Sequence, residues 1–470
     1  MAKQEKTQLA VLGGGPGGYA AAFMAADLGM DVALVDPEGN PGGVCLYRGC
    51  IPSKALLHAA RVVMESQEAA AWGIDFGACR VDVAKLRSWK DDVVRRLTGG
   101  VGTLAKHRKV RHLQGKGVFR DSGTLEVSLA EGKVDLAFER AILATGSLPV
   151  RLPGFPDSDR IWDSGQALRL EEVPGRLLVV GGGYIGLELG TVYAALGAEV
   201  SVVEMTSGIL PGVDRDLANV LKKRLEKLFK QLVFNAKVAG VDVSGKACSV
   251  EIQPEEGEKR TEEFDAVLVS VGRRPSTSGL GLENTDVQLN DDGFVAVNAE
   301  RRTRDSRIYA VGDVTGQPML AHKASHEGRI AAESMAGEAV VYEPRAVPAV
   351  VYTDPEIAWC GLTESEAKEK QRDVKVARFP WAASGRALTL GRSDGVTKVI
   401  VDPEDERILG VGIAGPQAGD LISEAVLAIE MGAVVNDLRY TIHPHPTLSE
   451  TLMEAADLVV GRSTHYHRRR

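Results

Sequence analysis

The feature that most constrains this chain of 470 residues is a structural device that occurs twice. Each copy has a short apolar strand, a glycine-rich turn, an apolar helix and a second strand that ends at an acidic residue. In the first copy, residues 9–12 lead into Gly13, Gly15 and Gly18 with the spacing GxGxxG, and the second strand ends at Asp36. This order predicts a βαβ unit that binds a dinucleotide.

The second copy repeats every part of the first. Residues 177–180 lead into Gly181, Gly183 and Gly186, and the next strand ends at Glu204. One GxGxxG alone is a weak signal, and its alternative interpretation is a glycine-rich turn without a ligand. Two copies in the same strand–helix–strand setting indicate two dinucleotide sites, so we expect an α/β fold with two Rossmann-like domains.

Each part of this device has a physical reason. The first glycine permits a tight turn, the second lets a pyrophosphate approach the backbone, and the third lets helix and strand pack closely. The helix N-terminus offers free N–H groups and the positive end of its dipole to phosphates. The terminal acid accepts hydrogen bonds from ribose hydroxyls.

Glycine and proline mark the ends of these units. Residues 144–147 and the proline-rich segment 149–156 close the first, and residues 272–275 close the second. From about residue 345 the pattern changes to that of a separate α+β domain. Its expected strands lie at 374–379, 396–401 and 408–413, and its expected helices lie near 417–431 and after 447.

A pair of cysteines follows the first unit. Cys45 and Cys50 are five residues apart, which in a regular helix puts them about 140° apart around the axis. A disulfide needs closer Cα atoms, so we expect a distorted segment, which Gly43, Gly49 and Pro52 permit. Zinc would need two more Cys or His ligands at matching spacing, and none is present, so we expect a redox pair and no metal.

A histidine near the C-terminus supplies a candidate base. A thiol must lose its proton before it attacks a disulfide, and His445, fixed between Pro444 and Pro446, can accept that proton. Glu450 can hold the other ring nitrogen. Alternatively, Thr447 and Glu450 form a capping box with threonine at the N-cap, and the two roles would compete for one carboxylate.

Charge and targeting signals exclude several classes of protein. The formal net charge of −8 argues against a nucleic-acid-binding protein. The hydrophilic start is not a signal peptide, and no apolar run is long enough to span a bilayer, so we expect a cytoplasmic enzyme. Cys79, Cys248 and Cys360 are expected to be buried small hydrophobes, and residues 465–470 a solvated basic tail.

The chain resembles the dihydrolipoyl dehydrogenase family, flavoproteins that oxidise dihydrolipoamide in 2-oxo-acid dehydrogenase complexes. The resemblance covers essentially the whole chain. It is carried by the Cys45–Lys54 segment, both glycine motifs, Tyr309–Asp313, Leu320–Ala324, Phe379–Ala387 and His445–Glu450.

The resemblance implies a four-part organisation. Residues 1–149 would form the FAD-binding domain, 150–272 the NAD-binding domain, 273–345 a central domain that completes the FAD site, and 346–470 the α+β dimerisation domain. It implies a homodimer in which His445 acts on the disulfide of the other subunit. The partner would be dihydrolipoamide, or the lipoyl-bearing acyltransferase core of a 2-oxo-acid dehydrogenase complex.

The resemblance also implies roles for single residues. Cys45 would attack the substrate, and Cys50 would lie against the flavin as the charge-transfer thiolate. Lys54 would sit near the flavin N5 and pair with Glu188, although a solvated helix charge is the alternative for Lys54. His445 with Glu450 would be the base.

The cofactor contacts follow in the same way. FAD would be held by Gly13, Gly15, Gly18, Asp36, Lys54, Gly117, Thr145, Gly146, Ser147, Asp313, Met319, Leu320, Ala321 and His322. NAD would be held by Gly181, Gly183, Tyr184, Gly186, Glu204, Val238 and Gly272, with Tyr184 as a lid or as ordinary helix packing.

Glu204 favours NAD over NADP. A carboxylate suits the free 2′-hydroxyl of NAD and repels the 2′-phosphate of NADP, and residues 205–207 contain no arginine. One departure from the family is Asp36, where a glutamate is more usual. The alternatives are an NADPH-dependent disulfide reductase of the glutathione-reductase type and, from another class, a non-catalytic redox-sensing or scaffold subunit.

Overall fold

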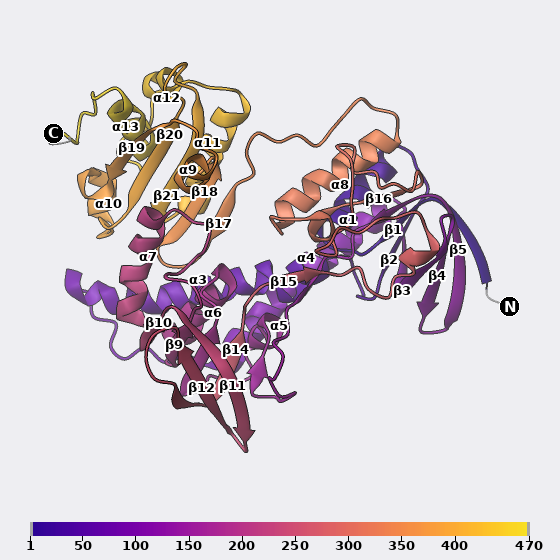
Figure 1. Ribbon diagram of the computed structural model, residues 1–470, viewed down its shortest axis with the longest axis horizontal. Helices are drawn as coiled ribbons and strands as arrows, with labels where there is room; N and C mark the ends of the chain where they lie inside the picture. The colour runs from indigo at the N-terminus through magenta and orange to yellow at the C-terminus, as the bar shows by residue number, and fades with distance from the viewer. Residues whose placement is uncertain (1–2, 468–470) are drawn as a thin grey trace.

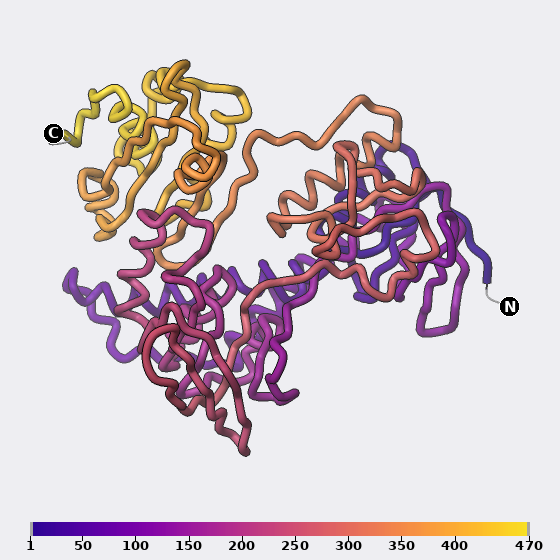
Figure 2. Tube along the Cα trace, in the orientation of Figure 1, coloured from indigo at the N-terminus to yellow at the C-terminus, as the bar shows by residue number. Residues whose placement is uncertain are grey.

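The computed structural model describes residues 3–467 and places them in three lobes (Figure 1). One lobe contains the N-terminus, the second lies below it in the view, and the third contains the C-terminal residues. The chain returns to the first lobe after the second, then crosses from α8 to the third as an extended segment, as Figure 2 shows. The first lobe is therefore built from two stretches that are distant in sequence.

The first lobe contains the first glycine motif. β1, β2, the start of β3, β5 and β16 form a parallel sheet, and β3, β4 and β5 continue as an antiparallel meander. Two helices, α1 and α8, pack together beside this sheet. The elements are β1 (Lys3–Leu12), α1 (Pro16–Asp27), β2 (Val32–Asp36), β3 (Arg111–Asp121), β4 (Thr124–Leu129), β5 (Gly132–Leu143), β16 (Ile308–Ala310), η3 (Gly312–Thr315) and α8 (Ala321–Met335).

The second lobe contains the second glycine motif on a parallel sheet of order β10-β9-β8-β14-β7. A three-stranded antiparallel sheet, β11-β12-β13, covers part of it. The elements are β7 (Ile161–Trp162), α5 (Ser164–Ala167), β8 (Arg176–Val180), α6 (Tyr184–Ala195), β9 (Glu199–Val203), α7 (Arg215–Leu228), β10 (Gln231–Val233), β11 (Ala236–Ser244), β12 (Ala247–Pro254), β13 (Arg260–Phe264) and β14 (Ala266–Val269). Both Rossmann-like units predicted from the glycine motifs are confirmed.

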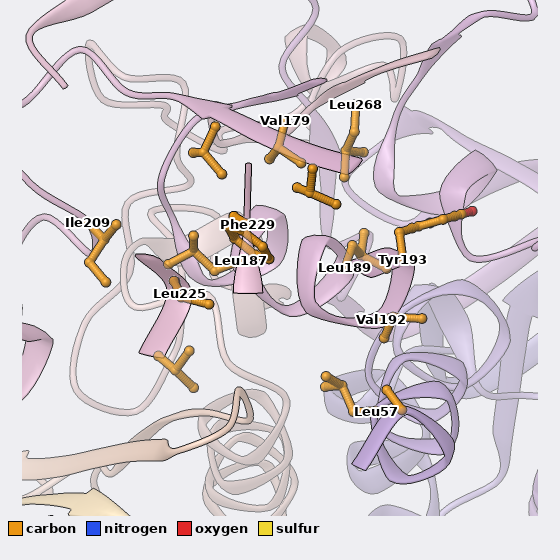
Figure 3. Close-up of a cluster of buried hydrophobic side chains, with 14 of the residues drawn as sticks. Leu57, Val179, Leu187, Leu189, Val192, Tyr193, Ile209, Leu225, Phe229 and Leu268 are labelled. Atoms are coloured by element: carbon orange, nitrogen blue, oxygen red, sulfur yellow. The ribbon is translucent and has the colours of Figure 1, made fainter. Parts of the chain in front are cut away.

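Two helices and a small sheet connect these lobes. Helix α3 packs on α4 and on α6, and β6 pairs with β15. Leu57 of α3 lies against the cluster formed by Leu187, Leu189 and Val192 of α6 (Figure 3). The connecting elements are α2 (Gly43–Arg48), α3 (Cys50–Glu68), η1 (Ala69–Trp72), α4 (Val83–His107), β6 (Ser147–Pro149), β15 (Arg273–Pro275) and η2 (Leu282–Asn284).

The third lobe is the expected α+β domain, with two strands more than the sequence pattern indicated. β17 and β18 extend the sheet to the antiparallel order β17-β18-β21-β20-β19. Helices α11 and α13 pack on it. The elements are β17 (Ala349–Val351), β18 (Glu356–Gly361), α9 (Glu364–Glu369), β19 (Lys375–Pro380), η4 (Trp381–Ala383), α10 (Gly385–Thr389), β20 (Val396–Val401), β21 (Ile408–Gly415), α11 (Ala418–Glu430), α12 (Val435–Tyr440) and α13 (Glu450–Val459).

His465 is exposed, as expected for a solvated tail, but it also makes a specific contact. Its Nδ1 lies 2.5 Å from Oε1 of the buried Glu454, and the backbone N–H of Thr464 donates to the other oxygen at 3.1 Å. The ring of Tyr466 packs edge-on against Phe379. The buried carboxylate therefore anchors this segment, and residues 468–470 lie outside the described part of the chain.

Two other expectations concern burial and membranes. Cys248 and Cys360 are buried as expected, whereas Cys79 is exposed. Among the described residues, no helix combines the length and the apolar character needed to cross a membrane.

Candidate active site

The first glycine motif has the geometry of a phosphate-binding turn. Gly13 has a φ of +107°, and a Cβ there would clash with the carbonyl oxygen of Ala144. A Cβ on Gly18 would clash with the carbonyl oxygen of Gly13, so helix and strand touch at this point. By contrast, nothing lies within 4 Å of a Cβ built on Gly15, so this side of the turn is open to a ligand.

The acid at the end of each second strand is held in the same way in both motifs. Asp36 Oδ2 accepts the backbone N–H of Gly14 at 2.5 Å, and Glu204 Oε2 accepts that of Gly182 at 2.6 Å. Burial raises the pKa of Asp36, and backbone hydrogen bonds act against that rise. Gly183 is as open as its counterpart in the first motif. The duplicated sequence therefore gives duplicated geometry.

A cavity of about 760 Å³ runs from the first glycine motif to the cysteine pair. Its volume, and a lining that includes both Asp36 and Cys50, fit a dinucleotide with a flavin. Among the residues expected to bind FAD, the lining includes Gly13, Gly15, Asp36, Lys54, Gly117, Thr145, Gly146, Ser147, Asp313, Met319 and Ala321.

Several of the expected contacts lie elsewhere. Leu320 and His322 do not line this cavity, and His322 Nε2 instead lies 2.7 Å from the carbonyl oxygen of Pro348. Val238 packs against the core beneath the second sheet. Tyr184, expected at the NAD site, lines the flavin-sized cavity, where burial raises its pKa to about 12. Gly18 lies behind the turn, as its packing role requires.

The cysteine pair lies at a break between two helices. Cys45 is in α2, Cys50 begins α3, and Gly49 separates them, so the expected distortion is confirmed. A Cβ on Gly49 would lie 2.8 Å from the carbonyl oxygen of Val44, which leaves no room for a larger residue. Both cysteines are free thiols that line the cavity.

The two thiols have different acidities. The Cys45 thiol hydrogen-bonds to the Cys50 sulfur, which, together with the nearby Lys54 ammonium, lowers the pKa of Cys50 to about 7. The same interaction raises the pKa of Cys45. Cys50 also begins α3, where the helix N-terminus stabilises a thiolate. Cys50 is therefore the thiol that ionises first.

A buried carboxylate lies beside the pair. Glu188 is 3% exposed, and its Oε2 accepts hydrogen bonds from Lys54 Nζ at 2.8 Å and Ser53 Oγ at 2.9 Å. The structure thus brings Lys54 and Glu188 together, and Lys54 is no isolated solvated charge.

Sequence reasoning missed one arginine in the cavity wall. Arg273 Nε donates to Ser147 Oγ at 2.7 Å, and its Nη2 donates to the Ser147 carbonyl oxygen at 2.7 Å. Ser147 Oγ in turn donates to Asp313. The sequence signal for Arg273 was the segment 272–275, which was interpreted only as a domain boundary.

His445 and Glu450 lie together on the third lobe. His445 Nδ1 is 2.8 Å from Glu450 Oε1, while Glu450 Oε2 accepts the backbone N–H of Thr447 at 2.7 Å. The carboxylate therefore serves both predicted partners at once, one with each oxygen. The capping box itself is only half formed. Helix α13 begins at Glu450 with Ser449 as its N-cap, so Thr447 is not the N-cap, and its hydroxyl donates to the carbonyl oxygen of Pro444.

The structure does not bring His445 to the cysteine pair within one chain. The His445 side chain is 71% exposed, and among the residues that the structure describes, none of the third lobe lines the cavity that contains Cys45 and Cys50.

Comparison with known proteins identifies the family that has this architecture. Residues 7–328 match the model of the pyridine nucleotide-disulphide oxidoreductases, and residues 347–456 match the dimerisation domain of that family. The chain belongs to this family. As expected from sequence, it is an oxidoreductase, and the family assignment confirms FAD and NAD as the cofactors.

Several relatives align over almost the whole chain. A dihydrolipoyl dehydrogenase of Vibrio cholerae is 45% identical over 99% of this chain and 98% of its own. A dihydrolipoyl dehydrogenase of Thermus scotoductus is 48% identical over 97% of this chain and 98% of its own. These identities confirm the resemblance to the dihydrolipoyl dehydrogenases.

Solved structures show the same fold. LpdA from Mycobacterium tuberculosis superimposes with a TM-score of 0.89 at 30% identity, covering 96% of this chain and 99% of its own. The flavoprotein disulfide reductase RclA from Escherichia coli gives 0.85 at 29% identity, covering 96% of this chain and 100% of its own. The fold is therefore shared with LpdA and with a flavoprotein disulfide reductase.

Proposed function

We propose that this chain is an NAD-dependent dihydrolipoyl dehydrogenase that works through Cys45, Cys50 and His445. The observation that carries the proposal is the acidified Cys50 thiol, hydrogen-bonded to Cys45 at the inner end of a flavin-sized cavity. The whole-chain relatives named dihydrolipoyl dehydrogenase support the same substrate.

The residues of the cavity suit FAD. The open turn at Gly15 and the N-terminus of α1 would hold the pyrophosphate, and Asp36 the adenosine ribose. Asp313, oriented through Ser147 and Arg273, would hold the ribityl chain. FAD, when bound, supplies the two-electron chemistry that connects the thiols with the nicotinamide nucleotide.

The thiol chemistry follows from the acidities of the pair. In the oxidised enzyme, a dihydrolipoamide thiolate attacks Cys45, breaks the Cys45–Cys50 bond and releases Cys50 as a thiolate. The second substrate thiol then attacks the mixed disulfide, so lipoamide leaves and Cys45 takes a proton. Cys50 is suited to be the leaving group, because the thiol with the lower pKa leaves faster.

His445 would accept the proton of the incoming thiol. Glu450 holds its Nδ1 side, which leaves Nε2 free to act as the base. Since His445 is exposed and remote from its own cysteines, we infer that it serves the cysteines of a second subunit. The match to the dimerisation domain supports this arrangement.

Glu204 would select the nucleotide. It is 8% exposed and held by the backbone N–H groups of Gly182 and Thr206. A 2′-phosphate placed against this carboxylate would be repelled in a partly desolvated site. NAD would lie over the second glycine motif, and Tyr184 would separate it from the flavin cavity.

We also propose a partner, a cellular location and domain limits. The lipoyl-bearing acyltransferase core of a 2-oxo-acid dehydrogenase complex would present the substrate, and the enzyme would work in the cytoplasm. The proposed domain limits are 1–149, 150–272, 273–345 and 346–470. The strand pairing supports these limits, because β16 follows the second unit in sequence but pairs with β5 in the first sheet.

One experiment tests the proposal directly. Rates are measured with dihydrolipoamide as the reductant and either NAD⁺ or NADP⁺ as the acceptor. In a further assay, glutathione replaces dihydrolipoamide as the reductant. We expect turnover with dihydrolipoamide and NAD⁺ only. Equal turnover with NADP⁺, or a preference for glutathione, would instead support the glutathione-reductase type.

A further inference from the structure

Glu188 lies where three parts of the chain meet. It belongs to α6, and its Oε2 binds Ser53 and Lys54 of α3. Its Oε1 accepts the backbone N–H of Tyr352 at 3.0 Å. Tyr352 directly follows β17, so one buried carboxylate joins the third lobe to the helix that begins with Cys50.

The side chain of Tyr352 makes a second contact with this group. Lys54 Nζ lies 4.5 Å from the centre of the Tyr352 ring, within the range of a cation–π interaction. The ammonium group thus has a carboxylate on one side and an aromatic face on another. These two contacts restrict a long side chain that is otherwise flexible.

Tyr352 is 39% exposed and borders the protein core through Val351, and its surroundings leave Lys54 another place to go. Leu57 of α3, Leu189 of α6 and Val351 of β17 belong to one hydrophobic cluster, part of which is drawn in Figure 3. Beside the ring lies a cavity of about 270 Å³, lined by Lys54, Tyr352, Asp354 and Glu356 among others. Without the ring, the ammonium could turn into this cavity toward the carboxylates.

Lys54 acts on Cys50. The cysteine lies one helical turn before the lysine, and the ammonium charge favours the Cys50 thiolate. The titratable groups that face Cys50 are Cys45 on α2, Lys54 on α3, Tyr19 on α1, and Tyr184 and Glu188 on α6. Lys54 is the only cation among these groups, so its position matters.

We propose that Tyr352 is a positioning residue for the redox pair: its ring keeps the Lys54 ammonium beside Cys50, and its backbone N–H orients Glu188. The third lobe thereby contributes to the reactivity of a thiol on the connecting helix α3. This inference rests on the proposed function, in which the Cys50 thiolate stands next to the flavin.

The test uses the holoenzyme in a Cys45→Ser background, where Cys50 is the only thiol of the pair. Tyr352→Leu removes the ring, and Tyr352→Phe keeps the ring and removes only the hydroxyl. Two titrations are measured for each variant: the long-wavelength absorbance of the Cys50 thiolate beside FAD, and the rate of Cys50 alkylation by iodoacetamide, followed by mass spectrometry.

We expect Tyr352→Leu to move both midpoints to higher pH by about 0.5, roughly a threefold loss of thiolate below the midpoint. Tyr352→Phe should leave both midpoints in place. The proposal is overturned if Tyr352→Leu titrates like the parent, even when its thermal stability falls, or if Tyr352→Phe shifts as far as Tyr352→Leu. Failure of the proposed function gives a different result: the parent would show no long-wavelength band at any pH, while the alkylation midpoints would still test Tyr352.

Discussion

Cys50 is the residue on which the proposed chemistry depends. The hydrogen bond from Cys45 and the charge of Lys54 favour its thiolate, whereas burial and the Glu188 carboxylate oppose it. Because the first two effects are larger, the pKa falls to about 7. The reactive form of the pair therefore changes within the pH range in which enzymes are usually assayed.

A pH dependence follows from this acidity. After reduction by two electrons, the enzyme should show a long-wavelength band from the Cys50 thiolate beside FAD. Because the thiolate exists above its pKa, the band should be full above pH 7 and decline as the pH falls through about 7. Anaerobic absorbance titration measures this, and a band of constant intensity on both sides of that pH would contradict the assignment.

The two cysteines are distinguished by single substitutions. Cys50→Ser should abolish the long-wavelength band, because it removes the thiolate. Cys45→Ser should show the band in the resting enzyme, because Cys50 then has no disulfide partner and keeps a hydroxyl donor nearby. A band that survives in Cys50→Ser and never appears in Cys45→Ser would reverse the two roles.

His445 and Glu450 give a third prediction. His445→Gln should lower dihydrolipoamide turnover by about 10²–10⁴-fold, the usual range for loss of a general base. Transfer of electrons from NADH to an artificial acceptor should barely change, since that route does not use His445. Glu450→Gln keeps an acceptor for the Thr447 N–H but loses the charge beside His445.

The Glu450→Gln enzyme should therefore keep its thermal stability while its turnover falls and its pH profile moves. Glu450→Ala is the matched variant that loses both contacts, and it should also lose about 1 kcal/mol of stability. Normal turnover of Glu450→Gln across the pH range would leave Glu450 with a capping role alone.

At the scale of elements, a buried charge network joins the second lobe to the third. Lys398 of β20 is 1% exposed, and its Nζ donates to Asp214 at 2.6 Å, Asp216 at 2.8 Å and Glu364 at 2.9 Å. Burial opposes ionisation of both aspartates, but Lys398 outweighs it together with backbone hydrogen bonds to Asp214 and with Arg378 beside Asp216, so their pKa values lie below the ordinary value.

Lys398→Met should destabilise the protein by about 3–5 kcal/mol, because it leaves the buried Asp214 carboxylate without its cation, whereas Asp216 and Glu364 keep Arg378. Lys375→Met, the same change at an exposed position on the neighbouring strand β19, should stay within about 0.5 kcal/mol. Urea unfolding at fixed protein concentration compares them. Similar midpoints for the two variants would contradict the role of the network.

The same network predicts a direction for acid unfolding. Since the pKa values of Asp214 and Asp216 are depressed in the folded state, their contribution to stability is present above the unfolded pKa. It is lost as the pH falls through the folded pKa. The wild-type protein should therefore lose more stability in acid than Lys398→Met does.

These elements also show what a sequence can reveal. Strands β20 and β21 and both glycine motifs were predictable, because local spacing and periodicity determine them. β17 was not, because it has three residues and no period to detect. The pairing of Lys398 with Asp214 and that of Tyr352 with Glu188 were not predictable either, because each joins residues more than a hundred positions apart.

At the scale of the whole molecule, we propose that Glu204 determines which nucleotide the enzyme accepts. We predict a preference for NAD⁺ over NADP⁺ of at least about 100-fold, or roughly 2.7 kcal/mol. Glu204→Gln should reduce this preference by weakening repulsion of the 2′-phosphate, while leaving the backbone contacts of Gly182 and Thr206 in place. An unchanged ratio of kcat/KM values would show that other groups select the nucleotide.

The central claim is that a complete site needs two chains, with thiols from one and His445 from the other. Cys45→Ser and His445→Gln homodimers, each inactive with dihydrolipoamide, can be mixed, dissociated and reassociated. About half of the dimers become hybrids with one intact site of two, so roughly a quarter of the wild-type NAD⁺ reduction should return. If hybrids form but no activity returns, His445 acts within its own chain or does not act at all.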